Sequence, residues 1–353
     1  MSKRFWIIIG LIVTLMVAAI IVIPTVANYL DNETSTNNVV QSNWYNYSWL
    51  YRKPITINNT GSLLTNYQMQ LNLDLSSVIP SHMLASGNDI IFTSSDGQTV
   101  LNYWIQSIST PSAAVIWVKV PSIPVGSPAV TIYMYYGNLG ATAASSGSNT
   151  FIFFEDFEGG VAGWTTSGTG SFTQVTSPTP QHGSYAARFN DTSTANSFTV
   201  TSPVFTTTVN PVIVELYEYP EQNGINMETR IQNGATIGPA FRWNNGANIQ
   251  YDLAGTWTNV AAPAGYTANT WYNIKLDRVT WVTGVTNDLY DFYVNGVSKV
   301  ASARYTADLN TVIDRIVLVG SAANIQPKMD IDLVKVRVYA ATPPTLGTMG
   351  AEE

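Results

Sequence analysis

Cysteine is absent from the 353-residue chain, and charged residues make up only 11% of it. The missing thiols exclude a disulfide framework, a thiolate metal site and a cysteine nucleophile. Only two histidines are present, His82 and His182, so a zinc site or a catalytic triad built on histidine is not expected. The net charge of −7, with basic residues scattered along the chain, excludes a basic surface for nucleic acid.

The polar part of the chain is mostly uncharged, and its apolar part is rich in aromatic side chains. Hydrophobic residues make up 45% and aromatic residues 12% of the sequence. β-Branched and aromatic residues favour strands, whereas Asn, Ser, Gly and Pro favour the turns between them. This balance is more typical of exported β-sheet proteins than of cytosolic helical enzymes.

One long hydrophobic run is present, at residues 5–23 (FWIIIGLIVTLMVAAIIVI). As a helix it would be about 28 Å long, close to the thickness of a bilayer core. Lys3 and Arg4 precede the run and the next basic residue is Arg52, so the positive-inside rule leaves the amino terminus in the cytoplasm. We therefore expect residues 5–27 to anchor the protein in the cell membrane as a single-pass helix, with the carboxyl-terminal region outside the cell.

The alternative is a signal peptide cleaved near Thr25-Val26-Ala27, which would give a secreted protein. Both interpretations export the rest of the chain. Export would make the Asn-x-Ser/Thr triplets candidate glycosylation sites, although an Asn- and Thr-rich chain also produces such triplets by chance. The four asparagines concerned are Asn32, Asn46, Asn58 and Asn190.

The chain after residue 45 consists of short strand-like runs separated by turn residues. In one of them, Gln68, Gln70, Asn72 and Asp74 alternate with apolar residues, as expected of an antiparallel sheet with one face in water. Further along, Asn295-Gly296 has the composition of a tight hairpin turn.

Composition also predicts the domain boundaries. The small-residue stretch at residues 139–150 separates a first from a second, longer β region. The expected division is 1–27 for the anchor or signal peptide, 28–45 for a polar linker, 46–138 for the first β-sandwich, 139–150 for a linker, 151–341 for the second β region and 342–353 for a tail.

The first β region carries a set of aromatic and acidic motifs. They are Trp49–Ile57, Asp89–Thr93 with Asp96-Gly97, Tyr103-Trp104-Ile105, Val115–Pro121 and Tyr133–Asn138. Together they resemble the domain-of-unknown-function family 2341 over residues 46–138. The resemblance implies an exported surface protein and no particular activity. Gln106 stands where this family often has Glu, which removes a carboxylate.

The second β region resembles a concanavalin A-like jelly roll of the lectin and glucanase type over residues 151–341. The resemblance rests on Phe154–Glu158, on Trp271–Leu276 followed by Tyr293–Gly296, and on Met329–Val336. It implies an all-β fold with two antiparallel β-sandwich domains, a small sandwich and a jelly roll, behind one amino-terminal transmembrane or signal helix.

The same resemblance implies a structural calcium ion near Glu158 and Asp332, with Asp156 as a further candidate ligand. Calcium accepts six to eight oxygen ligands, and it would offset the repulsion between neighbouring carboxylates. No other cofactor is expected. The alternative is an acidic rim of side chains that are solvated or cap strand ends.

Three aromatic residues flank a polar hairpin and are candidates for carbohydrate binding: Trp243, Tyr251 and Trp257. Sugars can stack on exposed aromatic rings, which combine an apolar face with a polar edge. The alternative for these residues is packing in the core of the sandwich or a surface patch on the hairpin.

Hydrolysis by a retaining glycosidase needs two carboxylates about 5–5.5 Å apart in a cleft. Glu215 and Glu218 are three apart, so on a strand their side chains point to opposite faces. We therefore expect no catalysis, but an adhesin-like or lectin-like module that binds surface carbohydrate or partner cells. The alternatives are a structural subunit of an envelope layer or pilus-like filament, in contact with neighbouring envelope proteins, and thirdly a polysaccharide hydrolase.

Overall fold

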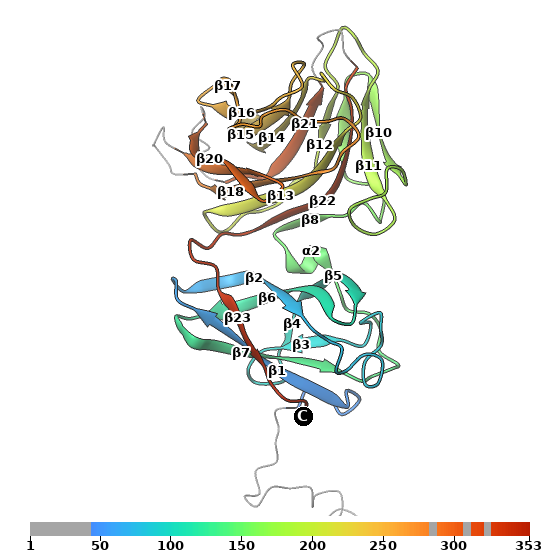
Figure 1. The fold of residues 1–353 in the computed structure, drawn as a ribbon, viewed down its shortest axis with the longest axis vertical. Helices are drawn as coiled ribbons and strands as arrows, with labels where there is room; N and C mark the ends of the chain where they lie inside the picture. The colour runs from blue at the N-terminus through green and yellow to red at the C-terminus, as the bar shows by residue number, and fades with distance from the viewer. Residues whose placement is uncertain (1–43, 282–287, 306–311, 321–325) are drawn as a thin grey trace, which may run out of the picture. The chain divides into compact units, whose positions relative to one another are not determined.

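The computed structural model describes residues 44–281, 288–305, 312–320 and 326–353. Every helix and strand in this part of the chain belongs to one compact unit, Tyr45–Glu353 (Figure 1). The described structure is almost entirely β, and its one helix, α2 (Gly147–Thr150), makes a single turn capped by Ser146. The prediction of an all-β fold built from antiparallel sheets is confirmed.

The expected membrane segment, residues 5–27, lies outside the described residues. Among the residues that are described, no helix is long and apolar enough to cross a membrane. The anchor, like the alternative signal peptide, therefore stays a prediction from the sequence.

Two antiparallel sheets form the first sandwich. The larger sheet has the order β23-β1-β7-β3-β4 and the smaller one the order β2-β6-β5. The strands are β1 (Tyr51–Asn59), β2 (Leu64–Leu73), β3 (Ile91–Thr93), β4 (Val100–Leu101), β5 (Tyr103–Thr110), β6 (Ala113–Ile123), β7 (Gly126–Tyr136) and β23 (Thr345–Met349). Their inward side chains, among them Ile55, Leu71, Ile116 and Ile132, form one buried core.

The carboxyl-terminal residues complete this first sandwich. Residues 342–353 were expected to form a tail, but β23 pairs with β1, with Leu346 opposite Ile57 and Met349 opposite Ile55. The reason is that Leu346 and Met349 pack against the core of the first sandwich. Along the chain, the second β region is therefore inserted between β7 and β23, the two strands that pair with β1 in the first sandwich.

A second sandwich lies between these two parts of the chain. One sheet has the order β10-β11-β22-β13-β18-β19-β20, with β8 also paired to β22, and the other has the order β17-β16-β15-β14-β21-β12-β9. In chain order these strands are β8 (Phe153–Glu155), β9 (Thr165–Ser167), β10 (Gly170–Val175), β11 (Ala186–Asp191), β12 (Thr199–Thr201), β13 (Val212–Pro220), β14 (Met227–Asn233), β15 (Thr236–Trp243), β16 (Ile249–Leu253), β17 (Thr256–Asn259), β18 (Tyr272–Val279), β19 (Leu289–Val294), β20 (Val297–Arg304), β21 (Arg315–Gly320) and β22 (Lys328–Val338).

A single aromatic-rich core fills the space between the sheets of the second sandwich. Phe189, Leu216, Phe241 and Phe292 are fully buried there. Part of the opposite face of the eight-stranded sheet contacts the first sandwich, where the buried Lys335 ammonium lies 5.0 Å from the ring centroid of Trp117. The outer face of the seven-stranded sheet carries partly exposed polar side chains, among them Glu228, Arg230 and Arg242.

Candidate binding face

The outer face of the seven-stranded sheet carries a regular array of polar side chains. Side chains alternate along a strand, so Thr229 and Ile231 of β14 point into the core and Glu228 and Arg230 point outward. The outward residues of neighbouring strands stand directly opposite one another, and they are partly exposed. We call this surface the binding face.

Hydrogen bonds link these outward side chains across three strands. Arg242 Nε donates to Gln250 Oε1 at 2.7 Å, and Gln250 Nε2 donates to Asn259 Oδ1 at 2.8 Å. The guanidinium of Arg242 also lies 4.5 Å from the ring centroid of Trp257. These contacts hold the half-buried indole of Trp257 in one orientation at the β17 edge of the sheet.

A hollow of about 410 Å³ lies on the binding face beside Trp257, and we call it hollow 1. Its lining consists of Glu228, Arg230, Ala235, Ile237, Ala240, Asp252, Gly255 and Trp257. Arg230 Nη2 lies 2.6 Å from Glu228 Oε2, and Asp252 Oδ1 accepts the Gly255 amide at 2.8 Å. Burial raises the pKa of the Asp252 carboxyl. Hollow 1 therefore combines an aromatic ring with fixed donors and acceptors.

A second hollow of about 420 Å³, hollow 2, lies over β12, β14 and β21. It is lined by Thr199, Thr201, Arg230, Gln232, Gly234, Ala235, Arg315, Val317 and Val319. Arg315 is paired with Asp314, with Nε 2.8 Å from Oδ1. Arg230 and Ala235 belong to the lining of both hollows, which therefore adjoin.

The structure separates the three aromatic residues that were predicted to bind carbohydrate. Trp243 is fully buried and Tyr251 is 8% exposed, and both belong to the core of the second sandwich. They are not available to a ligand, because each lies one position away from an outward residue and so points inward. Trp257 alone of the three lines a hollow.

The two glutamates weighed for hydrolysis lie on opposite faces of β13, as expected. Glu218 is fully buried in the core, where Thr229 Oγ1 and Trp243 Nε1 donate to its carboxylate, and burial raises its pKa to about 7. Glu215 lies on the other face, 3.6 Å from Lys335 Nζ. No cleft brings these two carboxylates together.

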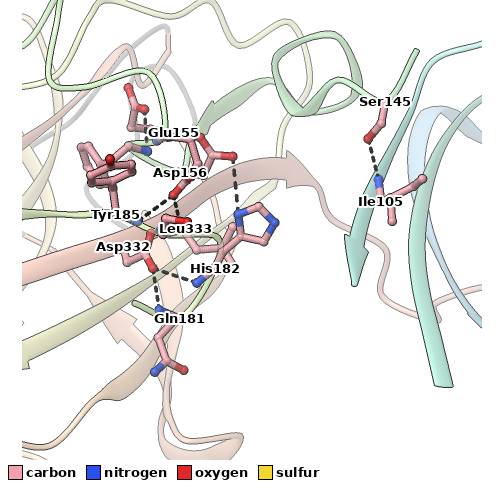
Figure 2. Close-up of polar contacts among 12 residues, drawn as sticks. Ile105, Ser145, Glu155, Asp156, Gln181, His182, Tyr185, Asp332 and Leu333 are labelled. Carbon is pink, nitrogen blue, oxygen red and sulfur yellow. Dashed lines mark hydrogen bonds and ion pairs between the residues drawn. The ribbon is translucent and has the colours of Figure 1, made fainter. Parts of the chain in front are cut away.

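Two of the carboxylates predicted to bind calcium, those of Glu158 and Asp332, accept backbone amides, and Figure 2 shows the contacts of Asp332. Asp332 accepts the amides of Gln181 and His182 at 2.7 and 2.9 Å, and Glu158 accepts those of Ser184 and Tyr185, both at 2.8 Å. These four amides belong to one loop. The two carboxylates therefore fix that loop against β22 and the turn that follows β8.

Asp156 lies beside this loop, with Oδ2 3.5 Å from His182 Nδ1. Burial raises the pKa of Asp332 to about 7, which disfavours a charged carboxylate there. Within the described ranges, no group of three or more His, Asp or Glu side chains is arranged to hold a metal ion. A calcium ion at Asp156, Glu158 and Asp332 stays a prediction of the sequence.

The predicted glycosylation sites differ in accessibility. Asn46 is exposed, whereas Asn58 and Asn190 are half-buried on β1 and β11. Asn58 Oδ1 accepts a hydrogen bond from Ser127 Oγ at 3.1 Å. Asn32 lies outside the described residues.

Sequence reasoning missed most of the binding face. Glu228, Arg230, Arg242 and Gln250 were not singled out, although each alternates with inward residues on its strand. That alternation was the available signal. It could not show that β14, β15, β16 and β21 lie side by side, because their pairing order is a property of the fold.

The chain is thus an all-β protein of two sandwiches. One sheet face of the second sandwich is polar, and Trp257 lies at the edge of that face. Residues 86–167 match the model of the family described as "Domain of unknown function (DUF2341)". The resemblance to this family is confirmed, over a range that begins later than residue 46 and extends beyond residue 138 to the end of β9. A search of curated proteins found no match.

Several solved structures show a distant similarity. A sialidase matches with 13% identity and a TM-score of 0.40, over 63% of this chain and 20% of its own. The "Cellulose induced protein, Cip1" matches with 12% identity and a TM-score of 0.38, over 53% of this chain and 99% of its own. The CBM22-1 xylan-binding domain from Paenibacillus barcinonensis Xyn10C matches with 12% identity and a TM-score of 0.30, over 54% and 96%. This chain thus spans about a fifth of the sialidase.

Proposed function

We propose that the protein binds carbohydrate on the binding face, with Trp257 as the aromatic contact. The observation that carries this proposal is hollow 1, where a fixed indole adjoins Glu228, Arg230 and Asp252. A sugar has apolar C–H faces and polar hydroxyl edges. An indole favours contact with the first, and charged donors and acceptors favour hydrogen bonds with the second.

The geometry of the polar side chains supports binding by a preformed site. Arg230 is held by Glu228 and Arg242 by Gln250, so these long side chains have already lost part of their rotamer freedom. A ligand that contacts them pays less conformational entropy than one that must order free side chains. Preorganisation of this kind favours a binding module.

The proposal is tested by isothermal titration calorimetry. The full chain, in a detergent that has no sugar headgroup, is titrated with a panel of plant, algal and microbial polysaccharides. Trp257→Ala should weaken the binding of any carbohydrate that the native protein binds by about fivefold or more, because it removes roughly 1 kcal/mol or more of stacking. Trp271→Ala is the matched control, since Trp271 is also half-buried but packs on Tyr219 outside the binding face. Equal binding by native protein and Trp257→Ala would contradict the proposal.

We further propose that binding occurs without catalysis. Of the carboxylates lining hollow 1, Glu228 is ion-paired with Arg230, and Asp252 accepts a backbone amide. Prolonged incubation with each bound polysaccharide should release no new reducing ends. Release that disappears in Glu228→Gln or Asp252→Asn would make the protein a hydrolase instead.

The compartment and the calcium ion complete the proposal and rest on the sequence. Residues 5–27 are proposed to hold the protein on the outside of the cell membrane. Protease added to intact cells should then remove the described part of the chain, and a protected chain would contradict export. We also propose that calcium binds at Asp156, Glu158 and Asp332. A melting temperature that falls when a chelator is added would support this, and an unchanged melting temperature would contradict it.

A further inference from the structure

The binding face has rows of paired residues that run perpendicular to the strands. One row crosses six neighbouring strands, from β12 through β21, β14, β15 and β16 to β17, which lie in this order in the second sandwich (Figure 1). Each member of the row is the direct register partner of the next: Thr199, Val319, Glu228, Arg242, Gln250 and Asn259. Five steps of about 4.8 Å between strands give a row about 24 Å long.

Both hollows lie along this direction. Hollow 1 belongs to the β14–β17 half of the sheet and hollow 2 to the β14–β12 half, and Arg230 lies in the lining of both. A single sugar ring would occupy a small part of this length. A chain of linked sugars running across the strands would contact Trp257 at one end and Thr199 and Val319 at the other.

The charges along the binding face balance. Arg230 is paired with Glu228 and Arg315 with Asp314, both at less than 3 Å, while Arg242 is held by Gln250 and Trp257. The carboxylate of Asp252 accepts a backbone amide. The three guanidinium groups are therefore matched by three carboxylates. A ligand that carried a negative charge on each sugar would meet no surplus of positive charge here.

We propose that the binding face takes an uncharged polysaccharide whose chain runs across the strands from β17 to β12, with several consecutive sugars bound. This inference rests on the proposed function and adds to it the class of ligand, its direction and its extent. Each added sugar contributes contacts until both hollows are filled. Affinity therefore depends on chain length and not on ionic strength.

The experiment uses the full chain in sugar-free detergent. Xylan, mannan, β-glucan and arabinan are the neutral probes, and polygalacturonate and heparin are the acidic ones. The disaccharide and hexasaccharide of the best neutral probe are then titrated at low and high salt. We expect the hexasaccharide to bind at least about tenfold more tightly than the disaccharide, at both salt concentrations, and the acidic polymers not to compete.

Two variants locate the ends of the chain. Thr199→Arg places a long side chain in hollow 2 and should weaken binding of the hexasaccharide severalfold while leaving the disaccharide unchanged. Thr173→Arg, on the exposed side of β10 in the other sheet, is the matched control. Trp257→Ala should weaken both ligands.

The outcomes separate this inference from the proposed function. Equal affinity for disaccharide and hexasaccharide, or an unaffected hexasaccharide in Thr199→Arg, would overturn the extended chain and leave carbohydrate binding in place. Salt-sensitive binding of the acidic polymers alone would overturn the uncharged ligand. If no carbohydrate binds at all, the proposed function fails together with the inference.

Discussion

Glu218 is a single carboxyl group placed where water cannot reach it. It accepts hydrogen bonds from Thr229 and Trp243, one to each oxygen, but lies entirely within the core of the second sandwich. Desolvation dominates over these two donors, and the pKa rises from 4.5 to about 7. The protonated form is therefore the one that the folded protein favours.

This residue makes stability depend on pH. Below about pH 4.5 the carboxyl is protonated in both the folded and unfolded chain, and its full contribution is present. Between pH 4.5 and about 7 the unfolded chain loses this proton while the folded chain keeps it. The free energy of unfolding therefore falls by about 3 kcal/mol across this range. Glu218→Gln should reduce this fall and raise the melting temperature at pH 8.

Thermal unfolding followed by circular dichroism between pH 4 and pH 8 checks the prediction. A glutamine can accept from Trp243 and donate to Thr229, so the substitution keeps both contacts. The exposed Asp74→Asn serves as control and should retain the native pH dependence. An identical pH dependence in Glu218→Gln and native protein would show that Glu218 does not titrate in this range.

At the scale of elements, the alternation of polar and apolar residues predicted where strands form, but not which distant segments contact them. In β2, Met69, Leu71 and Leu73 are buried as expected, and Gln70 is exposed. Gln68 is the exception: it is buried because its amide bonds Thr150 and Val338 outside the sheet. Contacts of this kind depend on chain segments far away in sequence, and a local pattern does not contain them.

Two further elements show the same limit. The polar hairpin beside Trp243 and Tyr251 forms between β15 and β16, but which of its aromatic residues face outward depends on a register that a local pattern does not contain. β23 was missed because five residues with two prolines before them look like a terminal tail. Its strand character comes from its partner β1.

The contribution of β23 can be measured. Leu346 lies against the core of the first sandwich and is half-buried, whereas Thr345 beside it is exposed. Leu346→Asp should lower the free energy of unfolding by about 1–2 kcal/mol through lost apolar burial and a poorly solvated charge. Thr345→Asp, the control, should change it by less than about 0.5 kcal/mol. Equal effects in urea denaturation would mean that β23 is not packed as described.

At the scale of the whole unit, Gln68 joins segments that are distant in the chain. Its Nε2 donates to Thr150 O at 3.2 Å and its Oε1 accepts the Val338 amide at 2.9 Å. Thr150 ends the short helix before the second sandwich, and Val338 ends the strand that leaves it. One side chain of the first sandwich thus holds both connections to the second.

Gln68→Leu should therefore lower the free energy of unfolding by more than an ordinary surface substitution does. Two buried backbone groups would lose a partner, at about 1–3 kcal/mol each, although the leucine recovers part of this by apolar contact. Gln70→Leu, two residues along the same strand and exposed, should have a small effect. Differential scanning calorimetry of both variants compares them, and equal melting temperatures would exclude a joining role for Gln68.

The insertion of the second sandwich between β7 and β23 has a consequence for biosynthesis. All strands of the second sandwich are contiguous in the chain, from β8 to β22, and can meet as soon as they leave the ribosome or the export channel. The first sandwich begins earlier but lacks its edge strand until residues 345–349 emerge. The portion of the molecule that is made first is therefore the last to be finished, and until then β1 presents an open edge to any other strand nearby.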